Sequence, residues 1–342
     1  MTEAELAALK SRADAGDPRA LMSYSQVLDA RGDHEGALQL LDRAARAGFA
    51  LAQHVLGARL MVARAAPYAP EEGVKLISAA AHGGLADAQR MLASIAVMSG
   101  QMKDAVLHLQ QAAKSGDAAA RGQLSLAAPG GEIDAAFWTD PAGIDEKIAS
   151  PRIGVVRNFI PKAVCEWLVN RAKPKLEAVR IRDPRGGVRQ DEYRTNSGMG
   201  FGFLDTDLVL QLVQLRIAAT IGVPLNHQEP TNILHYLPGE EYRPHYDFVD
   251  PNAAAHIDEL KKAGQRTVTF LIYLNDDFDG GETDFPKLDF RFRGAPGDAL
   301  VFWNIAPDGT PEKNSLHAGL APARGEKWLF SKWVRANPLP LI

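Results

Sequence analysis

The sequence has little cysteine and no long apolar segment. Cys165 is its only cysteine, which excludes an internal disulfide framework and favours a reducing compartment. No stretch approaches the roughly 20 apolar residues that a membrane-spanning helix requires. The N-terminus also lacks a basic segment followed by an apolar one, the pattern of a secretory signal peptide. We therefore expect a cytoplasmic protein with no membrane partner.

Strong charge of either sign is also missing. The formal net charge is −4 at pH 7, and no run rich in lysine and arginine is present. Such a balance gives no support to a nucleic-acid partner, because nucleic acids bind positively charged surfaces. The apolar content of 46% and the charged content of 23% are ordinary for a globular protein. Because 342 residues exceed the usual size of one domain, we expect two domains.

The N-terminal part, residues 1–126, is internally repetitive. A glycine followed four residues later by an alanine occurs at Gly16–Ala20, Gly48–Ala52, Gly84–Ala88 and Gly116–Ala120. The intervals between these pairs are 32, 36 and 32 residues, and apolar residues with the period of a helix precede each glycine. In this interpretation the glycine ends one helix and the alanine lets the next helix approach closely. The pattern predicts an α-α helical repeat solenoid.

The junction between repeats has the form Ala-Ala-x-x-Gly-x-x-x-Ala, as in the segment from Ala44 to Ala52. This junction resembles the Sel-like branch of the tetratricopeptide-type repeats. Helical repeats usually offer a concave face to a peptide or a protein, so the repeats are expected to recruit a protein substrate. A second interpretation stays open: the repeats stabilise the rest of the chain and bind nothing.

The periodicity changes after a predicted linker at residues 127–150, where turn-forming residues interrupt the helical pattern. Residues 151–342 begin with strand-like and helix-like segments, among them a strand at 179–183, a hairpin turn at 184–187 and a helix at 208–223. Short strands separated by Gly, Pro and Asp turns follow. We predict a multidomain α and β fold with an N-terminal solenoid and a C-terminal double-stranded β-helix, or jelly roll, with flanking helices.

Two residues in the downstream part have the spacing of metal ligands. His245 and Asp247 are two residues apart, so on a strand their side chains point to the same face. On its own this pair could be a structural hydrogen bond. A second histidine, His317, follows in a strand-rich context. Two histidines and one carboxylate form the facial triad of non-haem Fe(II) oxygenases, which leaves coordination positions open. We therefore predict a metal site.

Other segments of residues 151–335 fit the same chemistry. They are Arg194 to Gly198 (RTNSG), Tyr236 to Tyr242 (YLPGEEY), Arg266 to Asn275 (RTVTFLIYLN), Gly280 to Thr283 (GGET) and Gly297 to Trp303 (GDALVFW). A lysine, Lys327, follows His317 after ten residues. Together these segments resemble the prolyl 4-hydroxylase family of 2-oxoglutarate-dependent dioxygenases. The step from His317 to Lys327 is among the most specific elements of that resemblance.

The resemblance implies roles for particular residues around the co-substrate. His245, Asp247 and His317 are expected to hold Fe(II), and these three are the expected catalytic residues. Lys327 is expected to pair with the C5 carboxylate of 2-oxoglutarate, because a buried carboxylate needs a counter-ion. The residues expected to form hydrogen bonds with the co-substrate are Tyr236, Thr283 and, on the neighbouring strand, Tyr273.

Four further residues are expected to face the substrate. Tyr242 and Arg194 have this role in the resemblance. Strand alternation after Lys327 places Trp333 and Arg335 on the same face as Lys327, nearer to the mouth of the barrel. The same alternation turns Lys332 to the opposite face, where alanine is expected to be tolerated.

The resemblance implies an enzyme that uses Fe(II), 2-oxoglutarate and O2, with ascorbate supporting turnover. It would hydroxylate a prolyl or other residue in a protein or peptide while 2-oxoglutarate is converted to succinate and CO2. Two alternatives remain: hydroxylation of a free small molecule, and a scaffold in which the jelly roll has lost turnover and the repeats mediate binding. The complete ligand set together with Lys327 favours the enzyme.

Overall fold

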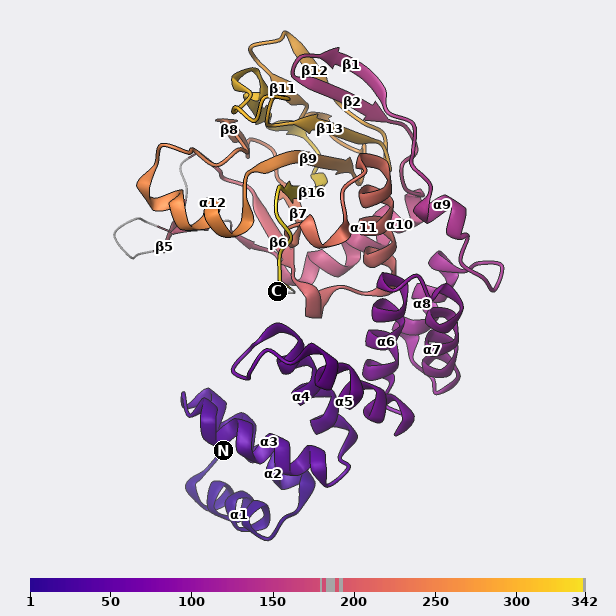
Figure 1. Cartoon of the computed structure of the whole chain (residues 1–342), viewed down its shortest axis with the longest axis vertical. Helices are drawn as coiled ribbons and strands as arrows, with labels where there is room; N and C mark the ends of the chain where they lie inside the picture. Colours follow the sequence, from indigo (N-terminus) through magenta and orange to yellow (C-terminus); the bar gives the residue numbers. More distant parts are fainter. Residues whose placement is uncertain (179, 183–187, 191–192, 341–342) are drawn as a thin grey trace. The chain divides into compact units, whose positions relative to one another are not determined.

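The computed structural model describes residues 1–178, 180–182, 188–190 and 193–340, with side chains in 1–178 and 193–340 (Figure 1). It divides into two compact units. The first consists of Met1–Ala135 and the segment Thr206–Leu212. The second consists of Ala136–Asp205 and Val213–Pro340. None of the described helices is long and apolar enough to span a membrane.

The first unit is built from helices in antiparallel pairs. They are α1 (Glu3–Asp14), α2 (Pro18–Ala30), α3 (His34–Arg46), α4 (Ala50–Val62), α5 (Pro70–His82), α6 (Ala86–Met98), α7 (Met102–Lys114) and α8 (Ala118–Ala127). The four repeat glycines follow α1, α3, α5 and α7 with φ angles between +80° and +96°. Since only glycine adopts this left-handed conformation without strain, it ends each of these helices. The four repeat alanines are at most 1% exposed. The predicted helical repeats are confirmed.

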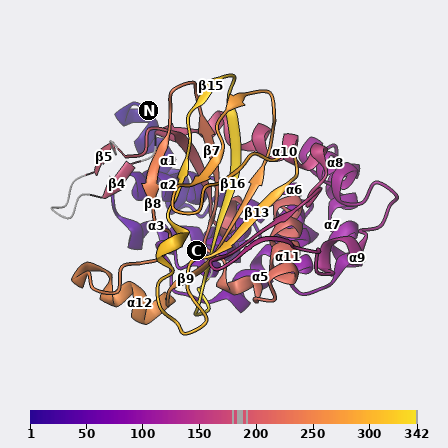
Figure 2. The same ribbon diagram turned by 90° about the horizontal axis from the view of Figure 1, so that it is seen from above.

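The second unit contains a large antiparallel sheet. Its eight strands lie in the order β1-β2-β13-β9-β16-β7-β6-β3. Their bounds are β1 (Asp145–Ala149), β2 (Arg152–Val156), β3 (Glu177–Ala178), β6 (Ser197–Phe201), β7 (Thr231–Tyr236), β9 (Arg266–Tyr273), β13 (Ala299–Trp303) and β16 (Lys327–Arg335). Figure 1 and Figure 2 show the central strands β13, β9, β16 and β7 side by side.

A smaller antiparallel sheet completes the barrel. Its order is β12-β11-β14-β8, formed by β8 (Tyr242–His245), β11 (Thr283–Phe285), β12 (Phe290–Phe292) and β14 (His317–Gly319). A shared apolar cluster joins the two sheets, with Leu271 and Leu329 from the large sheet and Phe285 and Phe292 from the small one. The short strands β10 (Asp279–Gly280) and β15 (Pro322–Arg324) pair with each other. This double-sheet arrangement confirms the predicted jelly roll.

Helices and two short strands accompany the barrel. They are α9 (Ala135–Thr139), α10 (Lys162–Ala172), α11 (Leu208–Ile221), α12 (Ile257–Ala263), β4 (Arg180–Arg182) and β5 (Val188–Gln190). The strand expected at 179–183 corresponds to β4, which pairs with β5, whereas the expected turn at 184–187 lies outside the described residues. Strand β1 falls within the range expected to be a linker. Its residues are mostly exposed, as on a sheet edge, so no apolar pattern marked it in the sequence.

Candidate active site

The pairing of β8 with β14 brings the two histidines of the predicted triad together. In this antiparallel pair His317 lies directly opposite His245, and Asp247 follows β8 by two residues. The Nε2 atom of His245 is 3.6 Å from Oδ1 of Asp247, and Nε2 of His317 is 3.4 Å from Oδ2. Candidate ligand atoms of the three residues all lie within 4.8 Å of one another. Strand register therefore assembles a cluster that the sequence distributes over some 70 residues.

Hydrogen bonds orient both imidazole rings toward this cluster. Nδ1 of His245 lies 2.8 Å from the carbonyl oxygen of Arg243, and Nδ1 of His317 lies 3.0 Å from that of Ser315. A carbonyl only accepts, so each Nδ1 carries the proton and each Nε2 presents its lone pair to the centre. The ring of Tyr242 stacks on that of His245, with centroids 3.4 Å apart and planes 15° apart. The protein itself therefore fixes the orientation of both imidazole rings, independently of metal binding.

The protonation states of the cluster suit a cation. Burial, together with the neighbouring His245, lowers the pKa of His317 to about 4. Burial acts to raise the pKa of Asp247, but the two imidazoles and the Thr269 hydroxyl outweigh it and hold that pKa below its ordinary value. At neutral pH His317 is therefore neutral and Asp247 is ionised. A metal requires these forms, and two imidazole nitrogens with one carboxylate oxygen suit Fe(II).

Lys327 is a buried cation without an internal partner. Its side chain is 0% exposed, and Nζ has no hydrogen-bond partner within the described part of the chain. The ammonium lies over the rings of Tyr236 and Tyr273, 4.8 and 5.6 Å from their centroids. Burial lowers the pKa of Lys327 to about 7, although Glu282 acts in the opposite direction. A buried unpaired ammonium is costly, so this site fits the distal carboxylate of 2-oxoglutarate.

The cluster lines a pocket of the barrel. Its polar lining consists of the three triad residues with Arg194, Tyr236, Tyr242, Thr283, Ser331 and Trp333. Leucines and small residues supply the rest of the wall: Leu234, Leu271, Leu329, Ala318 and Gly319. A concave site that combines apolar side chains with convergent polar groups is the usual form of a small-molecule site.

Comparisons with known proteins agree with this site. The family model of the 2OG-Fe(II) oxygenase superfamily matches residues 231–335. A protein of Arabidopsis thaliana named "Probable prolyl 4-hydroxylase 3" is 36% identical over 209 residues, which cover 55% of this chain and 70% of that protein. The chain belongs to the prolyl 4-hydroxylase family of 2-oxoglutarate–Fe(II) oxygenases. It is a 2-oxoglutarate-dependent dioxygenase whose cofactors are Fe(II), 2-oxoglutarate and O2.

Two solved structures match different parts of this dioxygenase. A viral collagen prolyl hydroxylase of Paramecium bursaria Chlorella virus-1, in complex with 2-oxoglutarate, is 26% identical and covers 54% of this chain and 96% of that one, with a TM-score of 0.43. A Sel1 repeat protein of Oxalobacter formigenes is 28% identical and covers 35% of this chain and 97% of that one, with a TM-score of 0.33.

The three residues expected to contact the co-substrate differ in position. Tyr236 and Thr283 line the pocket, and Tyr236 lies opposite Lys327 in the β7–β16 pair. Tyr273 is buried behind them. Its hydroxyl donates to the carbonyl of Phe292 at 2.8 Å and accepts the backbone N–H of Thr283 at 3.1 Å. The hydroxyl proton of Tyr273 is therefore bound to the carbonyl of Phe292 and is not available to the co-substrate, and Tyr273 instead holds Thr283 in place by a hydrogen bond.

Three of the four residues expected to face the substrate lie at the pocket: Arg194, Tyr242 and Trp333. The Arg194 guanidinium lies over the Tyr242 ring, 4.6 Å from its centroid, so Arg194, Tyr242 and His245 form one stack. Behind Trp333, the Arg266 guanidinium lies 3.8 Å from the ring centroid. A cation stacked on an aromatic face limits the movement of both side chains.

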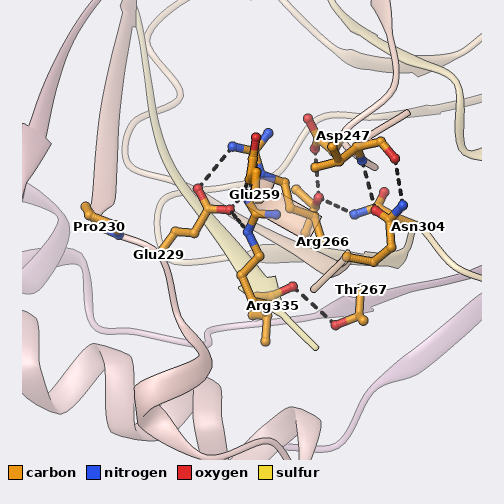
Figure 3. A network of polar contacts seen from close by, with 12 residues as sticks. Glu229, Pro230, Asp247, Glu259, Arg266, Thr267, Asn304 and Arg335 are labelled. Atoms are coloured by element: carbon orange, nitrogen blue, oxygen red, sulfur yellow. Dashed lines mark hydrogen bonds and ion pairs between the residues drawn. The ribbon is translucent and has the colours of Figure 1, made fainter. Parts of the chain in front are cut away.

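Arg335 lies elsewhere, which differs from the expectation drawn from strand alternation. It is 4% exposed, it is hydrogen-bonded to Glu229 and to Glu259 of α12, and its Nη1 donates to the carbonyl of Gly264 at 2.9 Å (Figure 3). The β16–β9 register shifts between Val334 and Arg335, so regular alternation ends just before this residue. These hydrogen bonds occupy the guanidinium within the protein.

Lys332 also differs from the expectation. Strand alternation does turn it away from the pocket, but the opposite face of β16 is buried as well. The side chain is 2% exposed, and its Nζ donates to the carbonyl of Glu229 at 2.8 Å. Alanine at this position would leave a cavity and an unpaired carbonyl, so tolerance is no longer expected.

Two polar residues near Asp247 were not recognised in the sequence: Thr269 of β9 and Asn304, directly after β13. Both are fully buried and hydrogen-bonded to each other. The strand Arg266 to Asn275 contained the signal for one of them, because a threonine inside an otherwise apolar buried strand needs a polar partner. The sequence contained no comparable signal for Asn304.

Proposed function

We propose that this dioxygenase hydroxylates a prolyl or other residue of a protein or peptide, with conversion of 2-oxoglutarate to succinate and CO2. The buried, unpaired ammonium of Lys327, which lies over the ring of the pocket residue Tyr236, supports the co-substrate most directly. The relative's name supports a prolyl substrate. Bound Fe(II) with 2-oxoglutarate supplies the activation of O2, which no side chain of this pocket provides.

The chain's own residues have four tasks in this proposal. His245, Asp247 and His317 hold the metal through two imidazole nitrogens and a carboxylate oxygen. Lys327 neutralises the C5 carboxylate of 2-oxoglutarate. The hydroxyl groups of Tyr236 and Thr283 offer it hydrogen bonds from the pocket wall. Water is excluded by the leucines that line the same pocket.

Arg194, Tyr242 and Trp333 form the substrate side of the pocket in this proposal. The Trp333 ring is a flat apolar surface suited to a pyrrolidine ring, the Tyr242 ring offers its edge from the stack with His245 and Arg194, and Arg194 offers donors to a backbone carbonyl of a peptide. Arg335 is left out of this set, because its hydrogen bonds to Glu229, Glu259 and Gly264 are made inside the protein.

Turnover with defined substrates tests the proposal. Purified protein with Fe(II), 2-oxoglutarate and O2 should produce succinate, and proline-containing peptides should gain one oxygen by mass spectrometry. Asp247→Ala serves as the inactive control. Oxygen gained by a free small molecule, with no peptide hydroxylated, would replace the peptide substrate with a small one. Absence of succinate under every condition would contradict the proposal.

We further propose that the domain of residues 1–126 recruits the protein substrate and that residues 127–150 link it to the catalytic domain of 151–342. A fragment without the repeats tests this proposal. Because strand β1 belongs to the large sheet, the truncation should remove only residues before α9. Metal and 2-oxoglutarate binding would verify that the fragment is folded. If the repeats recruit the substrate, the fragment should lose activity on the protein substrate but keep its activity on a short peptide. If the fragment is as active as the full-length protein on both substrates, the repeats are only a structural platform.

Two smaller proposals concern conditions in the cell. The single free cysteine favours a reducing, cytoplasmic location, which cell fractionation tests.

Ascorbate should extend turnover by returning oxidised iron to Fe(II), so the number of turnovers before inactivation should rise when ascorbate is added. A turnover number that does not respond to ascorbate would contradict this requirement.

A further inference from the structure

The Asp247 carboxylate accepts a hydrogen bond from a neutral side chain that does not line the pocket. The hydroxyl of Thr269, on the adjacent strand β9, lies 2.7 Å from Oδ2 of Asp247, and both side chains are buried. An ionised carboxylate only accepts hydrogen bonds, so the hydroxyl proton of Thr269 must point at Oδ2. This contact joins residues 22 positions apart in the sequence.

Asn304 determines where that proton points. One atom of its amide lies 2.9 Å from the hydroxyl oxygen of Thr269. Because Thr269 has already given its only hydroxyl proton to Asp247, its oxygen can only accept here. The amide atom in contact is therefore the NH2 group, Nδ2. This donation occupies a lone pair of the hydroxyl and keeps its proton directed at Asp247.

The main chain holds Asn304 firmly in this position. Its N–H donates to the carbonyl of Thr267 at 2.9 Å, and its carbonyl accepts the N–H of Glu312 at 2.9 Å. The residue is 0% exposed, and Oδ1 has no partner within the described residues. The bond to Thr269 is thus the side-chain hydrogen bond that the structure gives Asn304. Figure 3 shows Asn304 close to Asp247 in this buried network.

We propose that Thr269 and Asn304 are positioning residues for the metal-binding carboxylate. This inference rests on the proposed role of Asp247 as an iron ligand. The chain Asn304 → Thr269 → Asp247 fixes the rotation of the carboxylate by binding Oδ2, so that Oδ2 faces Nε2 of His317 and Oδ1 faces Nε2 of His245. Hydrogen bonds to ligating side chains of this kind typically change metal affinity by about 10- to 100-fold.

Thr269→Val tests this arrangement, since valine has nearly the same shape but no hydroxyl. The full-length variant should bind Mn(II) about 10- to 100-fold more weakly by calorimetry. Its Co(II) visible absorption should also change, because a carboxylate free to rotate alters the coordination. Thr269→Ser restores a hydroxyl and should restore both readouts. Thr267→Val is the matched control: it lies on the same strand, and its hydroxyl donates to the carbonyl of Val334 at 3.2 Å.

A double-mutant cycle tests whether Asn304 acts through Thr269. Asn304→Leu should weaken Mn(II) binding in the wild-type background and have little further effect in the Thr269→Val background, because the relay is already broken. Additive losses would overturn the relay. Normal Mn(II) affinity and a normal Co(II) spectrum in Thr269→Val would overturn the inference as a whole.

The Asp247→Ala variant separates this inference from the proposed function. If Asp247→Ala retains Mn(II) binding, the ligand assignment itself is wrong. If Asp247→Ala loses binding while Thr269→Val keeps it, the triad stands and only the positioning role is rejected. Thermal unfolding of the metal-free variants shows whether a loss reflects the site or the fold, and a loss that Thr269→Ser fails to restore at equal stability also counts against the inference.

Discussion

Replacing Lys327 with methionine should strongly weaken 2-oxoglutarate binding. Methionine keeps most of the aliphatic stem and removes the ammonium, so the perturbation is one of charge. Around this buried group lie the ring faces of Tyr236 and Tyr273, neither of which can serve as a counter-ion. Loss of one partner of a buried charge pair costs about 2–5 kcal/mol, and about 1.4 kcal/mol corresponds to a tenfold change. The dissociation constant should therefore rise roughly 30- to 3000-fold.

The same burial gives 2-oxoglutarate binding a particular pH dependence. Burial lowers the pKa of Lys327 to about 7, so the free protein loses the ammonium as the pH rises above neutrality. A bound carboxylate favours the charged form and raises that pKa again. Binding above neutral pH therefore takes up a proton, and the affinity should fall by up to about tenfold for each pH unit. Methionine does not titrate, so Lys327→Met should lose this dependence.

Calorimetry on the Mn(II)-loaded protein, from roughly pH 7 to pH 9, measures the affinity for 2-oxoglutarate and its pH dependence. Proton uptake on binding also makes the measured heat depend on the ionisation heat of the buffer. Lys332→Met is the matched control. Lys332 lies on the same strand, is buried, and has its pKa lowered by burial to about 7, but strand alternation turns it to the opposite face and its Nζ donates to the carbonyl of Glu229. Its replacement should leave both the affinity and its pH dependence nearly unchanged.

Two outcomes would refute this reasoning. Unchanged 2-oxoglutarate affinity in Lys327→Met would show that another group neutralises the distal carboxylate. A pH dependence that persists in Lys327→Met, or that disappears in Lys332→Met, would assign the titration to a different residue. Lys327→Arg should restore binding only in part, because a planar guanidinium does not fit the space of an ammonium.

Other measurements test the remaining parts of the structure. Asp247→Ala should weaken Mn(II) binding by at least about a hundredfold in calorimetry, because a direct ligand contributes more than the groups around it. Burial lowers the pKa values of Lys327 and Lys332 to about 7, so above that pH the unfolded chain binds more protons than the folded one. The free energy of unfolding of the metal-free protein should therefore rise between about pH 7 and pH 10. Methionine at both positions should flatten that rise. Arg335→Leu should lower the free energy of unfolding in urea by about 2 kcal/mol, because it removes charge-assisted hydrogen bonds while Arg266 still pairs with Glu229. Normal stability combined with weak substrate binding in that variant would instead support the substrate role that the sequence suggested.

The sequence by itself determined the repeats and the chemistry of the site. Helix period and the recurrence of glycine and alanine predicted the solenoid, because a left-handed residue and a close helix approach are local requirements. The two-residue step from His245 to Asp247 predicted that both side chains serve one site, although Asp247 lies two residues beyond the end of β8. His317 and Lys327 followed from residue type, spacing and family resemblance. The structure brings the three triad residues to one pocket and places the Lys327 ammonium over the ring of Tyr236, which lines that pocket.

Only the tertiary structure decided which side chains remain available to a ligand. Tyr273 lies near Lys327, but its hydroxyl is committed to the carbonyl of Phe292. Arg335 follows a register shift in β16 and is hydrogen-bonded to two carboxylates instead of facing the pocket. Thr269 and Asn304 are 35 positions apart in the sequence, yet they are in contact behind Asp247. Alternation within a strand is local, whereas hydrogen-bond partners depend on the register between strands, which no short stretch of sequence contains.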